Sequence, residues 1–167
     1  MTEVKASAAR RRFLRALAPL VLAAPAALAG ESLVRWTDIT LVDGRVLPAS
    51  ELQRQTVVVQ MWASWCPFCA RQNPHIQKLH DAGRDRGLLV LGFTLDKTPQ
   101  AARDYLAKHG YTFAAALTGP QVERWFGKRR TLPEVYVVDP AGRVVFREEG
   151  EMFPEDIAGL IRFAARK

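Results

Sequence analysis

Cys66 and Cys69 are the two cysteines of the chain, and they carry its clearest chemical signal. They follow the apolar β-branched run Val57-Val58-Val59, so we expect a buried strand to deliver them to the start of a helix. A helix N-terminus presents unpaired N–H groups and a partial positive charge, which both stabilise a thiolate. The spacing therefore predicts a redox-active dithiol with Cys66 as the nucleophile and Cys69, one turn further in, as the more buried resolving thiol.

Other chemistries of a cysteine pair fit the sequence less well. A zinc site would have to recruit two of His75, His80 and His109, at spacings unlike those of zinc fingers or ribbons. Haem attachment needs a histidine at position 70, where Ala70 stands. A purely structural disulfide would close too short a loop to restrict the unfolded chain strongly. We therefore expect no metal and no cofactor beyond the cysteine pair itself.

Residues 1–29 have the pattern of an export signal. An arginine-rich segment, Arg10 to Arg15, resembles a twin-arginine motif, and an apolar run follows it up to Ala29. The small residues Ala27 and Ala29 suit a cleavage site, which makes Gly30 the expected mature N-terminus. The apolar run is short for a membrane span. General secretion and an uncleaved N-terminal anchor remain open as alternatives, and residues 30–167 are expected to form a single domain.

Much of the positive charge belongs to this first segment. The whole chain has a net charge of +7, and residues 1–29 carry five basic residues and one acidic residue, which leaves about +3 for the remainder. The run Lys128-Arg129-Arg130 has no interleaved aromatic residues and is expected to be a solvated loop or a partner-facing patch. The composition therefore gives no indication of nucleic-acid binding.

Strands and helices are predicted to alternate, which is typical of an α/β domain with parallel pairing. A hairpin turning at Asp43-Gly44 precedes the first buried strand, and Ser50 is expected to cap a short helical turn. Asp96 closes a later strand at its carboxyl end, where α/β sheets place functional groups. Expected strands are 57–62, 88–95, 113–117, 133–139 and 143–147; expected helices run from the cysteine pair to about 83, with Pro74 kinking or dividing this helix, and over 98–109, 120–126 and 154–166.

Several motifs together resemble one family. The chain is similar to the TlpA/ResA-like periplasmic thiol:disulfide oxidoreductases of thioredoxin fold over nearly all of residues 30–167. The resemblance implies a central mixed sheet flanked by helices, an N-terminal hairpin, and an extra helix and strand between Asp96 and Pro133. The residues that carry it are Leu41 to Arg45, Val58 to Cys69, Leu91 to Asp96, and Leu132 to Asp139 with Gly142.

The resemblance also implies roles for residues around the pair. Pro133 matches a cis-proline that faces the cysteines and leaves the backbone of Leu132 free to pair with a substrate strand; an ordinary strand-opening proline is the alternative. Trp65 matches an aromatic residue that shields the nucleophile, with core packing as the alternative. Pro67 and Phe68, between the cysteines, complete the expected substrate contacts.

Three more side chains near the predicted site differ from the family pattern or have more than one possible role. Gln60 stands where many thioredoxins have a buried acid, and an amide cannot take a proton from Cys69. Asp96 is either a proton relay that tunes Cys69 or a capping residue before the next helix. Glu134 stands where the family usually has a small polar residue, and there it would contact substrate, repel acidic partners or raise the pKa of Cys66.

The sequence thus predicts an exported thiol-disulfide oxidoreductase. The resemblance favours a reductase of periplasmic protein disulfides, such as those of cytochrome c maturation or metal-site assembly, supplied by a membrane thiol electron donor. A dithiol oxidase is the first alternative. An alternative of another class is a copper-binding assembly module in which Met152 joins the two cysteines. A thiol peroxidase is disfavoured, since the cysteine pair is of the exchange type.

Overall fold

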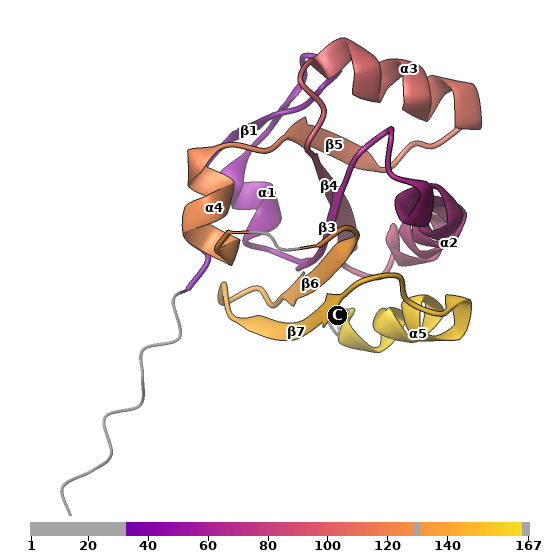
Figure 1. Ribbon diagram of the computed structural model, residues 1–167. Helices are drawn as coiled ribbons and strands as arrows, with labels where there is room; N and C mark the ends of the chain where they lie inside the picture. Colours follow the sequence, from indigo (N-terminus) through magenta and orange to yellow (C-terminus); the bar gives the residue numbers. More distant parts are fainter. Residues whose placement is uncertain (1–32, 129–130, 165–167) are drawn as a thin grey trace, which may run out of the picture. The chain divides into compact units, whose positions relative to one another are not determined.

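A five-stranded mixed sheet forms the centre of the protein (Figure 1). The computed structural model describes residues 33–128 and 131–164. The predicted export signal and the arginines of the 128–130 run lie outside these residues. The strand order is β5-β4-β3-β6-β7, in which β3 pairs parallel with β4 and antiparallel with β6. The strands are β3 (Thr56–Trp62), β4 (Leu88–Thr94), β5 (Ala114–Leu117), β6 (Glu134–Val138) and β7 (Val144–Glu149).

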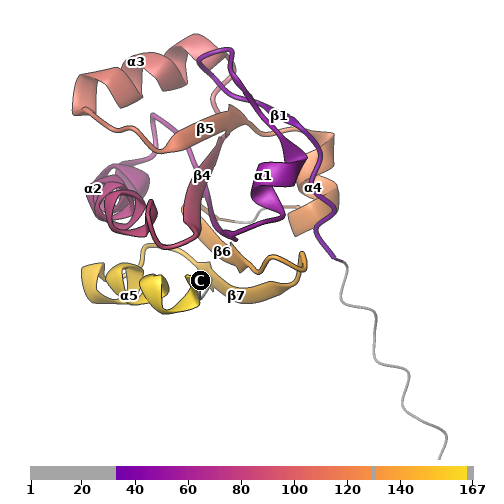
Figure 2. The ribbon, with the colours of Figure 1, turned by 180° about the vertical axis from the view of Figure 1, so that it is seen from behind.

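Side chains of the sheet alternate between two apolar cores, as strand geometry requires. One core joins Val58, Trp62 and Val135 to helices α2 (Pro67–Gly83), α3 (Pro99–His109) and α5 (Pro154–Gly159). The other lies under α1 (Ala49–Leu52) and α4 (Pro120–Phe126). Figures 1 and 2 show α2 and α5 on one side of the sheet and α1 and α4 on the other. Every residue of β3 is buried, which explains its nearly continuous apolar sequence.

The predicted hairpin is present, in a shorter form. Strands β1 (Ile39–Thr40) and β2 (Val46–Leu47) pair antiparallel on either side of the Asp43-Gly44 turn. Gly44 has φ +88°, a backbone conformation that is unfavourable for residues with a Cβ atom. The Asp43 carboxylate accepts a hydrogen bond from the Arg45 N–H at 3.0 Å, which closes the turn.

Two sequence predictions of helix geometry need correction, and a third is settled in part. Ser50 does not cap α1: the N-cap residue is Pro48, and the Ala49 N–H donates to the Asp38 carboxylate at 2.9 Å. Pro74 lies inside α2 without dividing it, and a kink there stays a prediction. The last helix was predicted to reach residue 166, but α5 ends at Gly159, a poor helix former, and a 3₁₀ turn continues over Leu160–Phe163. Among the described helices, none is long and apolar enough to cross a membrane.

Candidate active site

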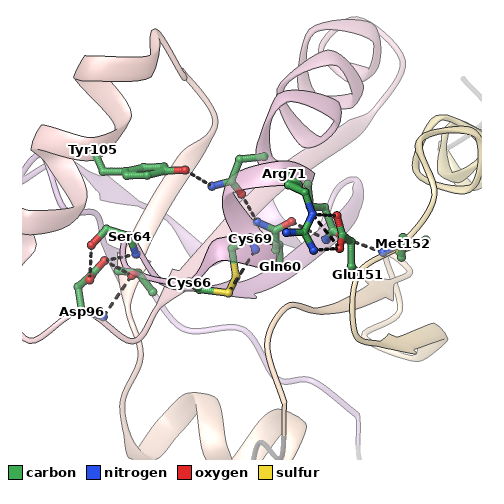
Figure 3. The surroundings of a disulfide bond; sticks show 12 residues. Gln60, Ser64, Cys66, Cys69, Arg71, Asp96, Tyr105, Glu151 and Met152 are labelled. Carbon is green, nitrogen blue, oxygen red and sulfur yellow. Dashed lines mark hydrogen bonds and ion pairs between the residues drawn. A yellow bond between two sulfur atoms is a disulfide. The ribbon is translucent and has the colours of Figure 1, made fainter.

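The two cysteines form a disulfide at the N-terminus of α2, with their Cα atoms 5.2 Å apart (Figure 3). Cys66 is the N-cap residue and Pro67 begins the helix, where its missing N–H costs nothing. The Cys69 N–H donates to Cys66 Sγ at 3.2 Å. Cys66 is 4% exposed and Cys69 is fully buried. A substrate can therefore approach Cys66 first, while the backbone N–H is already placed to stabilise a thiolate there.

Asp96 lies beside the segment that leads into Cys66. Its carboxylate accepts hydrogen bonds from the Ser64 hydroxyl at 2.7 Å, the Ser64 N–H at 3.1 Å and the Thr94 hydroxyl at 2.6 Å. These bonds connect the end of β4 to the turn between β3 and α2, as Figure 3 shows for Ser64. They favour a role in holding this turn. The proton-relay role stays a prediction.

The Leu132–Pro133 peptide bond is cis, which confirms the predicted geometry. Met61 pairs with Glu134, so Pro133 lies at the same sheet edge as the end of β3 and the cysteine pair. The Pro133 carbonyl accepts a hydrogen bond from the Gly150 N–H at 2.8 Å. Leu132 is half-buried. Docking of a substrate strand at Leu132 stays a prediction.

Exposed apolar side chains lie next to the cysteines in the chain. Trp65 is 66% exposed and Phe68 is 50% exposed, and Pro67 between the cysteines is also exposed. Core packing is therefore excluded as the reason for Trp65. Phe153, in the loop before α5, is 74% exposed. Large exposed apolar side chains near a reactive group are typical of an interaction surface.

Glu134 is not on this surface. Its side chain is fully buried and its carboxylate forms an ion pair with Arg147 at 3.1 Å. In the β6 alternation Glu134 shares a face with Tyr136, whereas Val135 belongs to the core that contains Cys66 and Cys69. The predicted direct contact of Glu134 with substrate is therefore not what the structure shows, because the side chain is buried and paired with Arg147. The sequence around Pro133 could not indicate this distant ion pair.

The structure adds a polar contact that the sequence did not indicate. Arg71 donates three hydrogen bonds to the Glu151 carboxylate, at 2.9, 3.2 and 2.5 Å, and lies over the ring of Phe68, 4.7 Å from its centre. The hydrogen bond from Arg71 lowers the pKa of Glu151. This pair joins the second turn of α2 to the loop that carries Phe153. No local pattern joins residues so far apart in sequence.

The part of the chain that the structure describes holds no group of three His, Cys, Asp or Glu side chains arranged for a metal. His109 is stacked on the ring of Tyr111 at 5.5 Å and contacts the ring of Tyr105 in a tilted arrangement at 4.5 Å. The backbone N–H of Met152 donates to Gln72. The described residues thus give the zinc alternative no support.

Comparisons with known proteins fit this geometry. Residues 28–160 match the Redoxin family. The chain belongs to the Redoxin family. A thiol:disulfide interchange protein DsbE homologue from Paracoccus denitrificans is 32% identical over 137 residues, 80% of this chain and 73% of the relative. A thiol-disulfide oxidoreductase ResA from Bacillus thuringiensis is 23% identical over 125 residues, 74% of this chain and 72% of the relative.

A solved structure shares the fold of this Redoxin-family chain. The thiol:disulfide interchange protein of the thioredoxin family from Chlorobium tepidum superposes with a TM-score of 0.72 at 20% identity, covering 80% of this chain and 96% of the other. The fold is thus thioredoxin-like, and the expected resemblance is confirmed. The Redoxin-family chain is a thiol-disulfide oxidoreductase of ResA/DsbE type, with Cys66 and Cys69 as its redox pair.

Proposed function

We propose that this oxidoreductase is exported and reduces disulfides of other exported proteins. The observation that carries the proposal is the Cys66–Cys69 pair at the start of α2, with Cys66 4% exposed, Cys69 fully buried and cis-Pro133 at the same end of the sheet. A binding module would not need one sulfur to be more accessible than the other. An enzyme that forms and resolves a mixed disulfide does.

In the first step the reduced enzyme attacks a substrate disulfide. The Cys66 thiolate forms a bond to one substrate sulfur, and the bond between the two substrate sulfurs breaks. The second substrate sulfur leaves with the electron pair and takes up a proton. The Cys69 N–H and the N-terminus of α2 stabilise the Cys66 thiolate before attack. Trp65 and Phe68 offer apolar surface to the substrate, and the backbone of Leu132 offers hydrogen bonds to an extended segment.

In the second step Cys69 releases the product. The Cys69 thiolate attacks Cys66 Sγ, the Cys66–Cys69 disulfide forms, and the bond from Cys66 to the substrate breaks. The substrate sulfur leaves with the electron pair and is protonated. The substrate has then gained two electrons and two protons, and the enzyme is in the disulfide form of this structure. A dithiol donor of the membrane must return the two electrons for another cycle.

The compartment and direction rest on different arguments. The arginine-rich and apolar pattern of residues 1–29 supports export, with the periplasm as destination. Resemblance to the ResA-like group supports reduction of periplasmic protein disulfides to thiols, such as those of cytochrome c maturation or metal-site assembly. A dithiol oxidase would use the same residues, with electrons passing from the substrate thiols to the Cys66–Cys69 disulfide.

The equilibrium reduction potential of the Cys66–Cys69 couple tests the direction. The protein is equilibrated with dithiothreitol and glutathione buffers, and fluorescence of Trp62 and Trp65 reports the redox state. A reductase is expected near the thioredoxin value of about −270 mV. A value near about −120 mV would reject the reductase and indicate an oxidant of exported thiols. Fractionation of cells that express the full chain tests export separately.

A further inference from the structure

A chain of buried amides runs beneath the disulfide and has no part in the steps above. The Met152 N–H donates to Gln72 Oε1 at 2.8 Å, and Gln72 Nε2 donates to Gln60 Oε1 at 2.9 Å. Gln60 Nε2 donates to Asn73 Oδ1 at 2.7 Å, and Asn73 Nδ2 donates to the Tyr105 hydroxyl at 3.2 Å. The four hydrogen bonds all run in one direction. Figure 3 shows them leading from Tyr105 by way of Gln60 toward Met152, close to the cysteine pair.

The chain of buried amides lies under the resolving cysteine, Cys69. Gln72 and Asn73 follow Cys69 by three and four residues, so they share its face of α2, one turn below it. Gln60, in the central strand, and Asn73 are fully buried, and Gln72 is 1% exposed. Buried amides cost free energy unless each finds a partner, and head-to-tail hydrogen bonds in a low dielectric strengthen one another. The helix turn of Cys69 is thereby tied to β3.

The first donor of the chain belongs to the loop beside the active site. Met152 lies between Glu151, which pairs with Arg71 of α2, and Phe153, which is 74% exposed. Gln72 and Arg71 are neighbours in α2 and hold adjacent residues of this loop. The loop and the turn that carries Cys69 are thus fixed to each other twice, once in the interior and once at the surface.

We propose that Gln60 and Gln72 are positioning residues for thiol exchange: the amide chain holds the Cys69 turn where its sulfur reaches the mixed disulfide on Cys66. This proposal rests on the two-step exchange above, and it concerns the resolving step alone. The amide side chains are all neutral, so they fix the position of the Cys69 turn without placing a buried proton acceptor beside Cys69.

Gln72→Leu tests the proposal, because it removes the bonds to both Met152 and Gln60. The mixed disulfide of Cys66 with glutathione is prepared, and its conversion to the Cys66–Cys69 disulfide is followed. We expect resolution about tenfold slower and, if the reverse reaction is unchanged, a reduction potential higher by about 30 mV, the equivalent of a tenfold change in the equilibrium constant. Alkylation of Cys66 by iodoacetamide should keep its wild-type rate.

Gln77→Leu is the matched control. Gln77 lies in the same helix, and its amide binds Thr112 and Asp81 instead of the chain. This variant should lose stability and keep the wild-type resolution rate and potential. If Gln72→Leu also keeps both, the amides only stabilise the fold and the proposal fails. Both results are independent of the direction of electron flow, because they compare variants with wild type whatever the absolute potential is.

Gln72→Glu tests the same idea without removing the side chain. A protonated carboxyl can still accept from Met152 and donate to Gln60, whereas a carboxylate cannot donate. Burial raises the pKa of such a carboxyl. Relative to wild type at each pH, resolution should therefore slow as pH rises through that pKa. A ratio that does not vary with pH would overturn the proposal, and this test stands even if Gln72→Leu does not fold.

Discussion

At the scale of single residues, Asp96 is an acidic residue that binds the turn leading into the cysteine pair. Its three hydrogen bonds go to Ser64 and Thr94, so the carboxylate holds the turn that precedes Cys66. These bonds give the carboxylate a structural role that does not require any contact with Cys69. Its position at the end of β4 was predictable from sequence, and its partners were not, because they depend on how the turn folds back.

Asp96→Asn should lower the free energy of unfolding by about 1–3 kcal/mol, because an amide cannot accept all three hydrogen bonds. We expect the pKa of Cys69 and its resolution rate to stay at wild-type values. Denaturant unfolding measures the first quantity, and thiol titration with single-turnover kinetics measures the others. A change in the Cys69 pKa or in resolution would instead support the proton-relay role of Asp96.

Glu134 and Arg147 give a second prediction for single side chains. Glu134 is fully buried and Arg147 is half-exposed, so removal of the arginine leaves a buried carboxylate without this partner. Arg147→Met should lower the free energy of unfolding by about 1–3 kcal/mol, below the usual cost for a fully buried pair because water reaches Arg147.

Arg143→Met is the control for this pair. Arg143 binds Asp139 through an exposed guanidinium, and its loss should cost less than about 1 kcal/mol. The double variant Arg147→Met with Glu134→Gln should recover part of the stability that Arg147→Met loses. Equal losses in Arg147→Met and Arg143→Met would show that burial of Glu134 does not make this pair special.

At the scale of elements, the Trp62 indole of β3 packs so closely against Gly92 of β4 that a Cβ does not fit there. A Cβ on Gly92 would lie 2.6 Å from Trp62 Nε1 and 3.1 Å from the ring of Phe113. Gly92→Ala should therefore displace the Trp62 indole and lower the free energy of unfolding by about 1–3 kcal/mol. Near-ultraviolet circular dichroism and denaturant unfolding measure the two effects. An unchanged spectrum would mean that the core relaxes without moving Trp62.

His80, in the last turn of α2, makes the stability of the fold depend on pH. Burial lowers the pKa of His80 below its ordinary value of 6.5, Arg84 lowers it further, and Asp81 opposes both. The unfolded chain therefore binds a proton at His80 more readily than the folded protein does. Between the two pKa values, stability must rise with pH and fall on acidification.

His80→Gln should remove this contribution. From about pH 7.5 to about pH 5.5, wild type should lose more stability than the variant, because only wild type can protonate His80 on unfolding. Urea midpoints at the two pH values give the comparison. Equal losses would mean that His80 has the same proton affinity in both states. Carboxylates such as Asp43, whose pKa is lowered, act in both proteins alike.

At the scale of the whole molecule, the sequence was sufficient where the signal is local. The Cys66–Cys69 pair, the buried run of β3 and the Asp43-Gly44 turn each depend on residues within a few positions. The cis bond at Pro133 followed from a family motif. The burial of Glu134, the exposure of Phe153 and the amide chain from Met152 to Tyr105 depend on pairing between distant segments, which neither periodicity nor spacing records.

The redox state should also set the stability of the whole fold. Formation of the disulfide and folding are linked, so a folded state that favours the disulfide is itself stabilised by it. A strong oxidant has the opposite property, because its reduced form is the stabilised one. If the protein is a reductase, the oxidised form should therefore unfold at a higher denaturant concentration than the dithiol form.

Denaturation of both forms, with the dithiol form kept in dithiothreitol, measures this difference directly. Cys66→Ser with Cys69→Ser is the control, since dithiothreitol should leave its unfolding midpoint unchanged. A dithiol form that resists denaturant better than the disulfide form would contradict the reductase assignment and agree with an oxidant. The difference in free energy of unfolding between the two forms should match the difference between the disulfide potentials of the folded and unfolded protein, because the four states close a thermodynamic cycle. A mismatch would show that unfolding is not two-state, so direction would then rest on the potential of the folded protein alone.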